Sequence, residues 1–270
     1  KKSKKPGHRQ IGYILKIKLE PVIVRNVWIF EITRYIWGHK LTILTPLEIE
    51  ALKLSLRVAF ASIMICLPIG VLTAWILVRF NFRGKMVLNT FVYIPLVLPP
   101  VVLGYILLLI FGRRGGFGEW IWEAFGVTFV FNWKGAAIAA FVMAFPLMVR
   151  AVKLSLEEID LSLEDAARTL GAPNWWVFIS ITLPLMLPGI ITGSMLTFAR
   201  SLGEFGATIT FVSNIPGETR TLPLALYTAI QSPDGEPQAI RLVIICLIIS
   251  FSAIIISELL SRYTQKKLGK

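Results

Sequence analysis

Residues 157–184 read EEIDLSLEDAARTLGAPNWWVFISITLP and contain the clearest helix signals in the chain. Ser162 can cap a helix, and Asp165 three residues later completes a capping-box pattern. Gly171 suits the left-handed position after a helix, and Pro173 prevents the helix from continuing. The stretch therefore predicts a two-turn helix between Ser162 and Gly171, which is too short to be stable on its own.

The helical periodicity divides this short helix into an apolar face and a polar face. The apolar face carries Leu163, Ala166, Ala167 and Leu170, and the polar face carries Glu164, Asp165, Arg168 and Thr169. Two interpretations fit the apolar face. It can dock into a groove on another protein, or it can rest on lipid headgroups. Docking is the favoured interpretation, because the helix is too short to be stable alone and its apolar face has no span of its own to cover.

Long uncharged runs flank the short helix on both sides. Hydrophobic residues make up 55% of the 270 positions and charged residues 16%, so the composition excludes an ordinary soluble domain. Five runs are candidate membrane spans, at residues 58–78, 86–112, 135–149, 175–199 and 242–257. A further uncharged run, residues 205–217, is too short to cross and is expected to be a continuation or a re-entrant segment. We therefore expect an all-α integral membrane protein with five core transmembrane helices.

The formal net charge of +12 lies mostly at the two ends of the chain. Ten of the 28 basic residues fall within residues 1–40 and four within residues 262–270, which favours lipid headgroups rather than nucleic acid as the partner. Cys66 and Cys246 lie inside uncharged runs, so a disulfide framework is not expected. The sequence has no metal-binding Cys/His spacing, and it has no phosphate-binding G-x-x-x-x-G-K-[ST] motif, so the chain is not expected to be a P-loop ATPase itself.

The first 45 residues form a basic N-terminal extension with no signal-peptide pattern in residues 1–40. Residues 21–37 contain three charged side chains, which favours an interfacial amphipathic helix or a disordered tail over a crossing. If the loop around residues 157–176 is cytoplasmic, five crossings place the C-terminus and its basic tail, residues 266–270, inside the cell as well. The same count places the basic N-terminal residues outside, against the positive-inside rule.

The segment Asp165-Ala166-Ala167, followed by Gly171 and then by Ile181-Thr182-Leu183-Pro184, resembles the EAA loop of ABC importer permeases. The pattern of that family is E-A-A-x3-G-x9-I-x-L-P, and Asp165 takes the place of the usual Glu. The resemblance implies a type I ABC importer permease fold over residues 46–265. It also implies a cytoplasmic coupling helix that sits in a cleft of an ATPase subunit. The coupling residues would be Glu164, Asp165, Ala166, Ala167, Arg168, Leu170 and Gly171.

Other stretches are similar, more narrowly, to the permeases of bacterial molybdate importers. They are residues 94–100, 111–116 and 145–150, and above all residues 200–221, RSLGEFGATITFVSNIPGETRT. The resemblance covers about residues 50–265. It implies an inner-membrane homodimer that works with ATPase subunits and an extracytoplasmic molybdate-binding protein. The chain itself would bind no cofactor, and the partner would use ATP and Mg. A sulfate/thiosulfate or tungstate permease and a passive anion channel are the alternatives.

Arg200 and Glu204 follow the fourth predicted span and stand four residues apart, as neighbours on one helix. Ionisable groups at this depth are costly and usually face the interior of a bundle or an aqueous path. One interpretation is an ion pair that orders the helix. The other places Arg200, Ser201, Glu204 and Thr208 at the anion route or its gate, and the sequence leaves both open.

Overall fold

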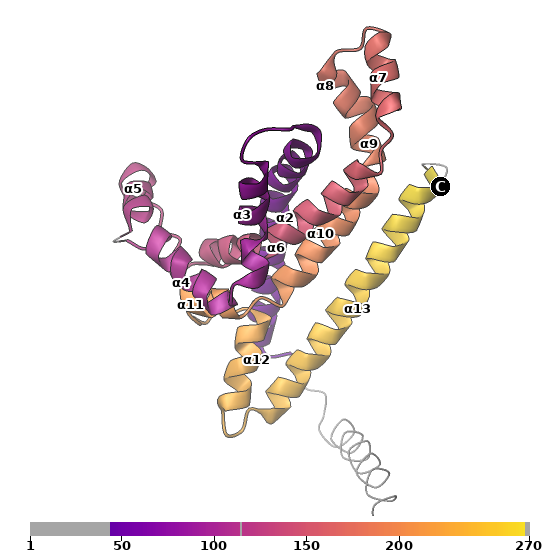
Figure 1. The fold of residues 1–270 in the computed structure, drawn as a ribbon. Coiled ribbons are helices and arrows are strands. Elements are labelled where there is room, and N and C mark those ends of the chain that lie inside the picture. Colours follow the sequence, from indigo (N-terminus) through magenta and orange to yellow (C-terminus); the bar gives the residue numbers. More distant parts are fainter. Residues whose placement is uncertain (1–43, 114, 268–270) are drawn as a thin grey trace, which may run out of the picture. The chain divides into compact units, whose positions relative to one another are not determined.

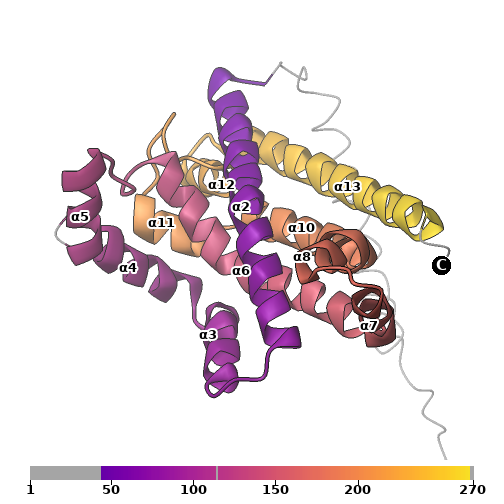
Figure 2. The same cartoon turned by 90° about the horizontal axis from the view of Figure 1, so that it is seen from above.

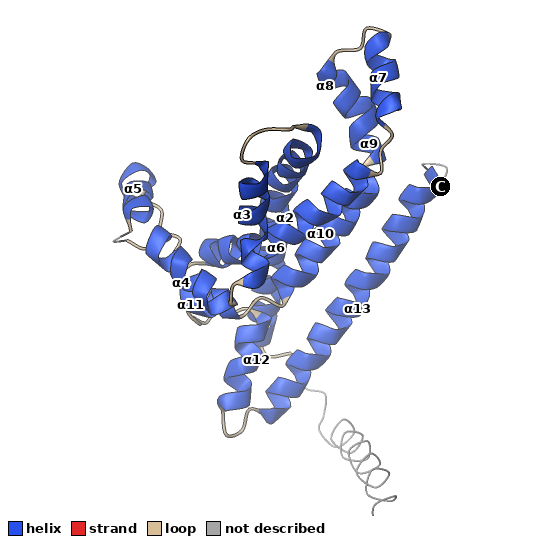
Figure 3. Ribbon diagram, in the orientation of Figure 1, coloured by secondary structure: helices blue, strands red, loops and turns tan. Residues whose placement is uncertain are grey.

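The structure is a computed structural model that describes residues 44–113 and 115–267, with side chains described up to residue 263 (Figure 1). The expectations for residues 21–37, and for the end of the basic tail, lie outside the described residues. The unit described below spans Pro46–Lys270. All its regular elements within the described ranges are helices, as Figure 3 shows, so the predicted all-α class is confirmed.

Among the described residues, three helices are long and apolar enough to cross a membrane alone: α2 (Pro46–Arg79), α6 (Trp133–Glu157) and α13 (Glu236–Lys267). Two further apolar stretches are bent. One joins α3 (Lys85–Val97) to α4 (Pro100–Phe111). If each bent pair is one span, the described chain has five, which is the number expected from the sequence.

The second bent stretch runs from Asn174 to Leu202. It consists of α8 (Asn174–Val177), the π-helical turn η1 (Phe178–Thr182), α9 (Leu183–Leu185) and α10 (Leu187–Leu202). The axis turns by 64° between Leu185 and Leu187, where Met186 separates α9 from α10. Pro184 and Pro188 flank this break, and each lacks a backbone N–H.

The candidate span at residues 86–112 consists of two helices, because the axis turns by 116° between α3 and α4. Leu98 is extended, with φ −71° and ψ 140°, and Pro99 forms the N-cap of α4. A residue that precedes proline is driven out of the helical region by the proline ring. Pro100 then occupies the first position of α4, where its missing N–H has no partner to lose.

One contact fixes how the chain passes through this bend. Arg79, the last residue of α2, forms an ion pair with Glu164 in α7 (Leu161–Thr169), which begins shortly after α6 ends. The C-terminal ends of α2 and α6 therefore lie at the same end of the bundle. Since α6 begins at the opposite end, the segment that contains α3, α4 and α5 (Gly116–Phe125) carries the chain from one end to the other. The bend between α3 and α4 lies within this segment.

The centre of the unit is the crossing of α2, α6 and α10, seen from above in Figure 2. Small residues allow these helices to approach closely. A Cβ atom added at Gly70 in α2 or at Gly193 in α10 would lie 2.6 or 2.7 Å from the side chain of Met148 in α6. Gly189 and Gly193 form a G-x-x-x-G pair within the fourth predicted span, and such a pair is typical of close helix contacts.

The run at residues 205–217 forms a short, separate helix, α11 (Gly206–Val212), that packs against α4 and α6. Its backbone lies very close to α4. A Cβ at Gly104 would lie 2.6 Å from the carbonyl oxygen of Ala207, and a Cβ at Gly206 would lie 2.8 Å from the ring of Pro100. Two helices were not expected from the sequence: α5 (Gly116–Phe125) and α12 (Leu222–Gln231).

Candidate functional site

The helix predicted around residues 162–171 is present as α7, but its cap differs from the prediction. The carboxylate of Asp160 accepts a 2.9 Å hydrogen bond from the N–H of Ser162, so Asp160 is the N-cap and the Ser162 capping box is wrong. A carboxylate at this position also interacts favourably with the helix dipole. The bond from the Ser162 N–H lowers the pKa of Asp160, so the cap is complete above the ordinary pKa and weakens as pH falls through the lowered one.

The C-terminal end of α7 follows the prediction. Gly171 has φ +87°, and its N–H donates to the carbonyl of Arg168 at 2.9 Å. The N–H of Ala172 donates to the carbonyl of Ala167 at 3.1 Å, which completes a Schellman motif. A residue with a Cβ would be strained at Gly171, so this glycine sets the point at which the chain turns back toward α8.

Glu164 is the buried member of α7, with 3% of its surface exposed. Its Oε1 accepts hydrogen bonds from Arg79 at 2.6 Å and from the hydroxyl of Thr182 at 2.9 Å. Its Oε2 accepts one from Arg168 at 3.2 Å. The prediction placed Glu164 beside Asp165 on the polar face of the helix and did not anticipate that Arg79 from α2 covers Glu164.

The remaining side chains of α7 face outward. Leu170 is 88% exposed, Leu163 is about half exposed, Ala166 is exposed and Ala167 is half-buried. The predicted apolar face is therefore uncovered in the described chain. The side chain of Asp165 is 69% exposed and accepts a 2.9 Å hydrogen bond from Arg168. Of the two adjacent acids, Glu164 is thus tied to the bundle, while Asp165 points into the surroundings.

Sequence reasoning gave no role to Arg79 or Thr182. The sequence does contain a signal that could have identified Arg79. It is the first charged residue after the uncharged run 58–78, and it lies at the same end of the spans as the loop around residues 157–176, which is predicted to be cytoplasmic. A cavity of about 680 Å³ lies beside the cluster and is walled in part by Trp75, Arg79, Arg168 and Phe178.

The second predicted site lies where α10 ends. Arg200 and Glu204 form an ion pair of 2.6 Å, and Glu204 is 2% exposed. They do not share a helix as expected, because α10 ends at Leu202. The other oxygen of Glu204 accepts a 2.8 Å hydrogen bond from the N–H of Ala207 in the first turn of α11. The carboxylate thus joins α10 to α11.

Ser201 and Thr208 are both buried near this junction. The hydroxyl of Ser201 donates to the hydroxyl of Ser62 in the middle of α2, at 3.0 Å. The structure therefore brings Arg200 and Glu204 into direct contact and directs Ser201 toward α2. Ser62 is a contact that the sequence analysis did not anticipate.

A third polar cluster, also missed from the sequence, lies at the N-terminal end of α2. Glu48 is fully buried and pairs with Arg241 in α13, with Nε to Oε1 and Nη2 to Oε1 distances of 2.9 Å each. The hydroxyl of Ser55 accepts a 2.7 Å hydrogen bond from the N–H of Leu222, the first residue of α12. Glu48 precedes the uncharged run 58–78, so an argument based on uncharged runs could not include it.

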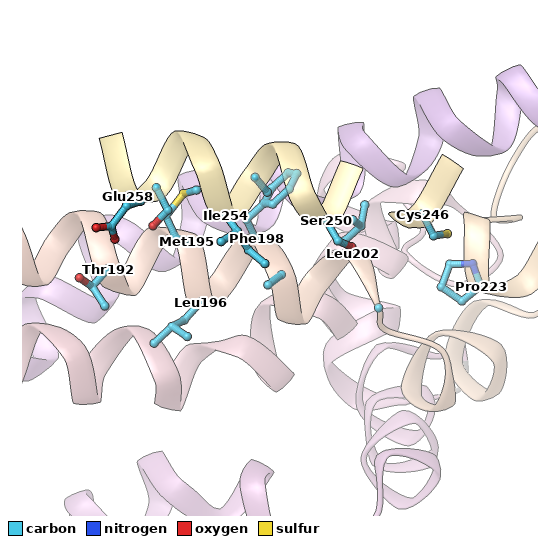
Figure 4. A pocket seen from close by; sticks show the side chains of 14 residues that line it. Thr192, Met195, Leu196, Phe198, Leu202, Pro223, Cys246, Ser250, Ile254 and Glu258 are labelled. Atoms are coloured by element: carbon cyan, nitrogen blue, oxygen red, sulfur yellow. The ribbon is translucent and has the colours of Figure 1, made fainter. Parts of the chain in front are cut away.

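A second cavity, of about 410 Å³, lies between α10 and α13 (Figure 4). Its wall is mainly apolar, with Met195, Phe198 and Ile254 among the lining side chains and Glu258 at one end. Across residues 44–113 and 115–267, no group of three or more His, Cys, Asp and Glu side chains is placed to hold a metal ion.

Comparison with known proteins adds three findings. Residues 66–270 match the family model of the binding-protein-dependent transport system inner membrane component. The chain is 57% identical over 228 residues to the molybdenum transport system permease protein ModB of Escherichia coli (strain K12), which covers 84% of this chain and 100% of the relative. It is 34% identical over 245 residues to the sulfate transport system permease protein CysT of the same organism, covering 89% and 87% of the two chains.

Among solved structures, a chain of a bacterial ABC transporter involved in the import of alginate superposes with a TM-score of 0.69, covering 94% of this chain and 96% of that chain. A second structure of a bacterial alginate transporter, in complex with a pentasaccharide-bound periplasmic protein, gives a TM-score of 0.68 with 97% and 96% coverage. Sequence identity is 16% in both cases, so these likenesses show the fold alone.

Proposed function

The chain belongs to the family of binding-protein-dependent transport system inner membrane components, with a type I ABC importer permease fold, and on this premise we propose that it is the permease subunit of an ATP-driven molybdate importer. The observation that carries the substrate class is the 57% identity with a molybdenum permease over that relative's whole length. Identity with the sulfate permease is 34%, which makes sulfate the weaker candidate.

We further propose that α7 is the coupling helix that docks into a cleft of a partner ATPase. The uncovered apolar side chains of Leu163 and Leu170 supply surface that gains free energy when it leaves water. Asp165, Ala166, Ala167 and Arg168 would complete the docking face, and Gly171 would fix its end. Glu164 would act through its buried contacts, which hold the face outward. ATP and Mg would be bound by the partner.

The transport cycle in this proposal requires two copies of the chain. One α7 per chain matches one ATPase subunit per chain, and a two-fold axis between the copies would hold the pathway. Closure of the ATPase pair would draw the two coupling helices together and open the pathway on the far side, where a binding protein delivers the oxyanion. The coupling loop and the C-terminus would then face the cytoplasm.

Arg200, Ser201, Glu204 and Thr208 would lie at the gate of this pathway. The supporting observation is their position at the break between α10 and α11, where the buried Glu204 joins the two helices. The ion pair and the hydrogen bond from the Ala207 N–H both end on the side chain of Glu204, so both can break without loss of the hydrogen bonds inside either helix. Arg200 would also neutralise the carboxylate, which otherwise would repel an oxyanion.

Uptake by the reconstituted complex tests the proposed function. We expect the chain, together with its ATPase and binding protein in liposomes, to import molybdate only when ATP is present. A tenfold excess of sulfate is expected to leave molybdate uptake nearly unchanged. Preferred import of sulfate would favour the sulfate permease instead. Import that continues without ATP would favour a passive channel.

The docking role of α7 gives a separate prediction. Leu170→Asp places a charge on the docking face, and we expect the ATPase to bind at least about tenfold more weakly, because a carboxylate would be desolvated there. Met86→Asp is the matched control, since Met86 is 84% exposed at the start of α3. Co-purification of the ATPase with each variant is the measurement. Equal recovery with Leu170→Asp and Met86→Asp would refute docking through this face.

A further inference from the structure

We propose that Arg79 is the positioning residue that joins the coupling helix to the membrane bundle, and that α2 carries movement of the coupling helix to the junction of α10 and α11. The inference rests on the proposed docking of α7 to an ATPase and adds the route inside this chain. It assigns a role to Arg79, to Ser62 and to the far end of α2, none of which belongs to the loop motif itself.

The first step is to identify the elements from which the hydrogen-bond partners of Glu164 come. Arg168 lies on α7 itself, and Thr182 lies in η1, a short distance along the same chain segment. Arg79 differs from both, because it is 85 residues away in sequence and ends a different long helix. Its 2.6 Å ion pair with Glu164 is therefore a direct link from α7 to a helix outside its own segment.

The second step is the strength of this link. The Glu164 side chain is almost completely buried and the Arg79 side chain is largely buried. Separating two buried, oppositely charged groups leaves each without its partner in a medium of low dielectric constant, which is unfavourable. The cationic Arg79 also lies at the C-terminal end of α2, where the helix dipole favours positive charge. A displacement of α7 is therefore expected to move the end of α2 rather than break the pair.

The third step is what α2 touches along its length. It is one helix of 34 residues, about 51 Å long at the usual rise per residue. Midway along α2, Ser62 accepts a hydrogen bond from the hydroxyl of Ser201. Ser201 is adjacent to Arg200 in the sequence and lies close to the junction of α10 and α11. Near the N-terminal end of α2, Ser55 accepts a hydrogen bond from the N–H of Leu222 in α12, and Glu48 forms an ion pair with Arg241 in α13. The same helix thus contacts the coupling helix, the candidate gate, α12 and α13.

A purely structural role for Arg79 predicts a different result from a role in transmission. Fewer folded molecules would lower uptake and ATP hydrolysis in proportion. Loss of transmission would lower the number of molybdate ions imported per ATP hydrolysed, and this ratio does not depend on the amount of folded complex. The ratio is therefore the quantity to measure.

The experiment uses the full complex with ATPase and binding protein in liposomes. Arg79→Met removes the charge and keeps most of the side-chain volume. We expect the ATPase to remain bound, ATP hydrolysis to continue, and the molybdate-to-ATP ratio to fall by between about fivefold and 150-fold, the usual range for coupling between two sites. Arg79→Lys restores a positive charge and is expected to recover much of the ratio. Arg83→Met is the control, because Arg83 is exposed in the neighbouring loop.

The outcomes distinguish failure of the transmission role of Arg79 from failure of the proposed docking of α7 to an ATPase. An unchanged ratio in an assembled Arg79→Met complex would overturn the transmission role and leave the docking of α7 intact. Loss of the ATPase from that variant would also overturn it, because Arg79 would then serve docking instead. Failure of the unaltered chain to bind an ATPase would reject the proposed function itself. If methionine instead prevents the chain itself from folding, Arg79→Gln, which keeps a hydrogen-bond donor without the charge, is expected to lower the ratio in the same way.

Discussion

Replacement of Glu164 by leucine is expected to abolish molybdate uptake and to release α7 from the bundle. The change leaves the guanidinium of Arg79 without its carboxylate in a largely buried position and removes the acceptor of the Thr182 hydroxyl. Breaking a buried pair on one side costs about 3 to 5 kcal/mol. This loss of free energy exceeds the stability that an isolated helix of nine residues has on its own. Uptake by cells and protease cleavage at Arg168 are the measurements.

Asp165→Leu is the matched control for Glu164→Leu, because the two acids are adjacent and both accept hydrogen bonds from Arg168. Asp165 is mostly exposed, so its loss is expected to cost less than about 1 kcal/mol and to leave the cleavage pattern unchanged. Equal effects of the two substitutions on protease cleavage would show that burial of Glu164 does not hold α7 in place.

Replacement of Arg200 by glutamate is expected to have the second-largest effect. The new carboxylate would lie next to Glu204, whose other oxygen is committed to the N–H of Ala207. A partly exposed carboxylate at position 200 would repel the buried carboxylate of Glu204, which would also lose its cationic partner, so we expect a loss of about 3 kcal/mol. The measurements are the yield of monodisperse protein in detergent and its melting temperature.

Arg262→Glu provides the comparison for Arg200→Glu. Arg262 pairs with Glu258 at the same spacing of four residues and at 2.7 Å, but both side chains are exposed. Loss of an exposed pair of this kind is expected to cost less than about 0.5 kcal/mol. If Arg200→Glu instead matched Arg262→Glu in melting temperature and also imported molybdate normally, both the buried pair and its place at the gate would be rejected.

Residues 157–184 and the uncharged runs were sufficient to predict the all-helical class, the five apolar stretches and the Gly171 terminus of α7. Local rules govern these features, because helix ends and apolar runs depend on neighbouring residues. The size of the bend between α3 and α4 was not predicted, because residues 86–112 were identified as one span by their lack of charge, a criterion that does not depend on Pro99 and Pro100. Their combined effect on Leu98 turns the axis by 116°, which is too much for a single straight helix.

The candidate sites were predicted less completely than the fold, and the reason is distance along the chain. The orientation of Glu164 depends on Arg79, 85 residues away, and that of Ser201 depends on Ser62, 139 residues away. Periodicity assigns side chains to faces but does not say which face another helix covers. The cap of α7 was missed for a local reason, since Asp160 competes with Ser162 for the same N-terminal N–H groups.

The contact between α4 and α11 has a consequence for how this protein can change over evolutionary time. Gly104 and Gly206 each face a neighbouring helix so closely that a single added carbon atom would overlap it. No one-step substitution at either position can be accepted unless α11 first moves away from α4. Such a move would also disturb the hydrogen bond from Ala207 to Glu204. Sequence drift at this contact therefore requires several coordinated replacements, and the two glycines are expected to persist while the surrounding apolar residues vary.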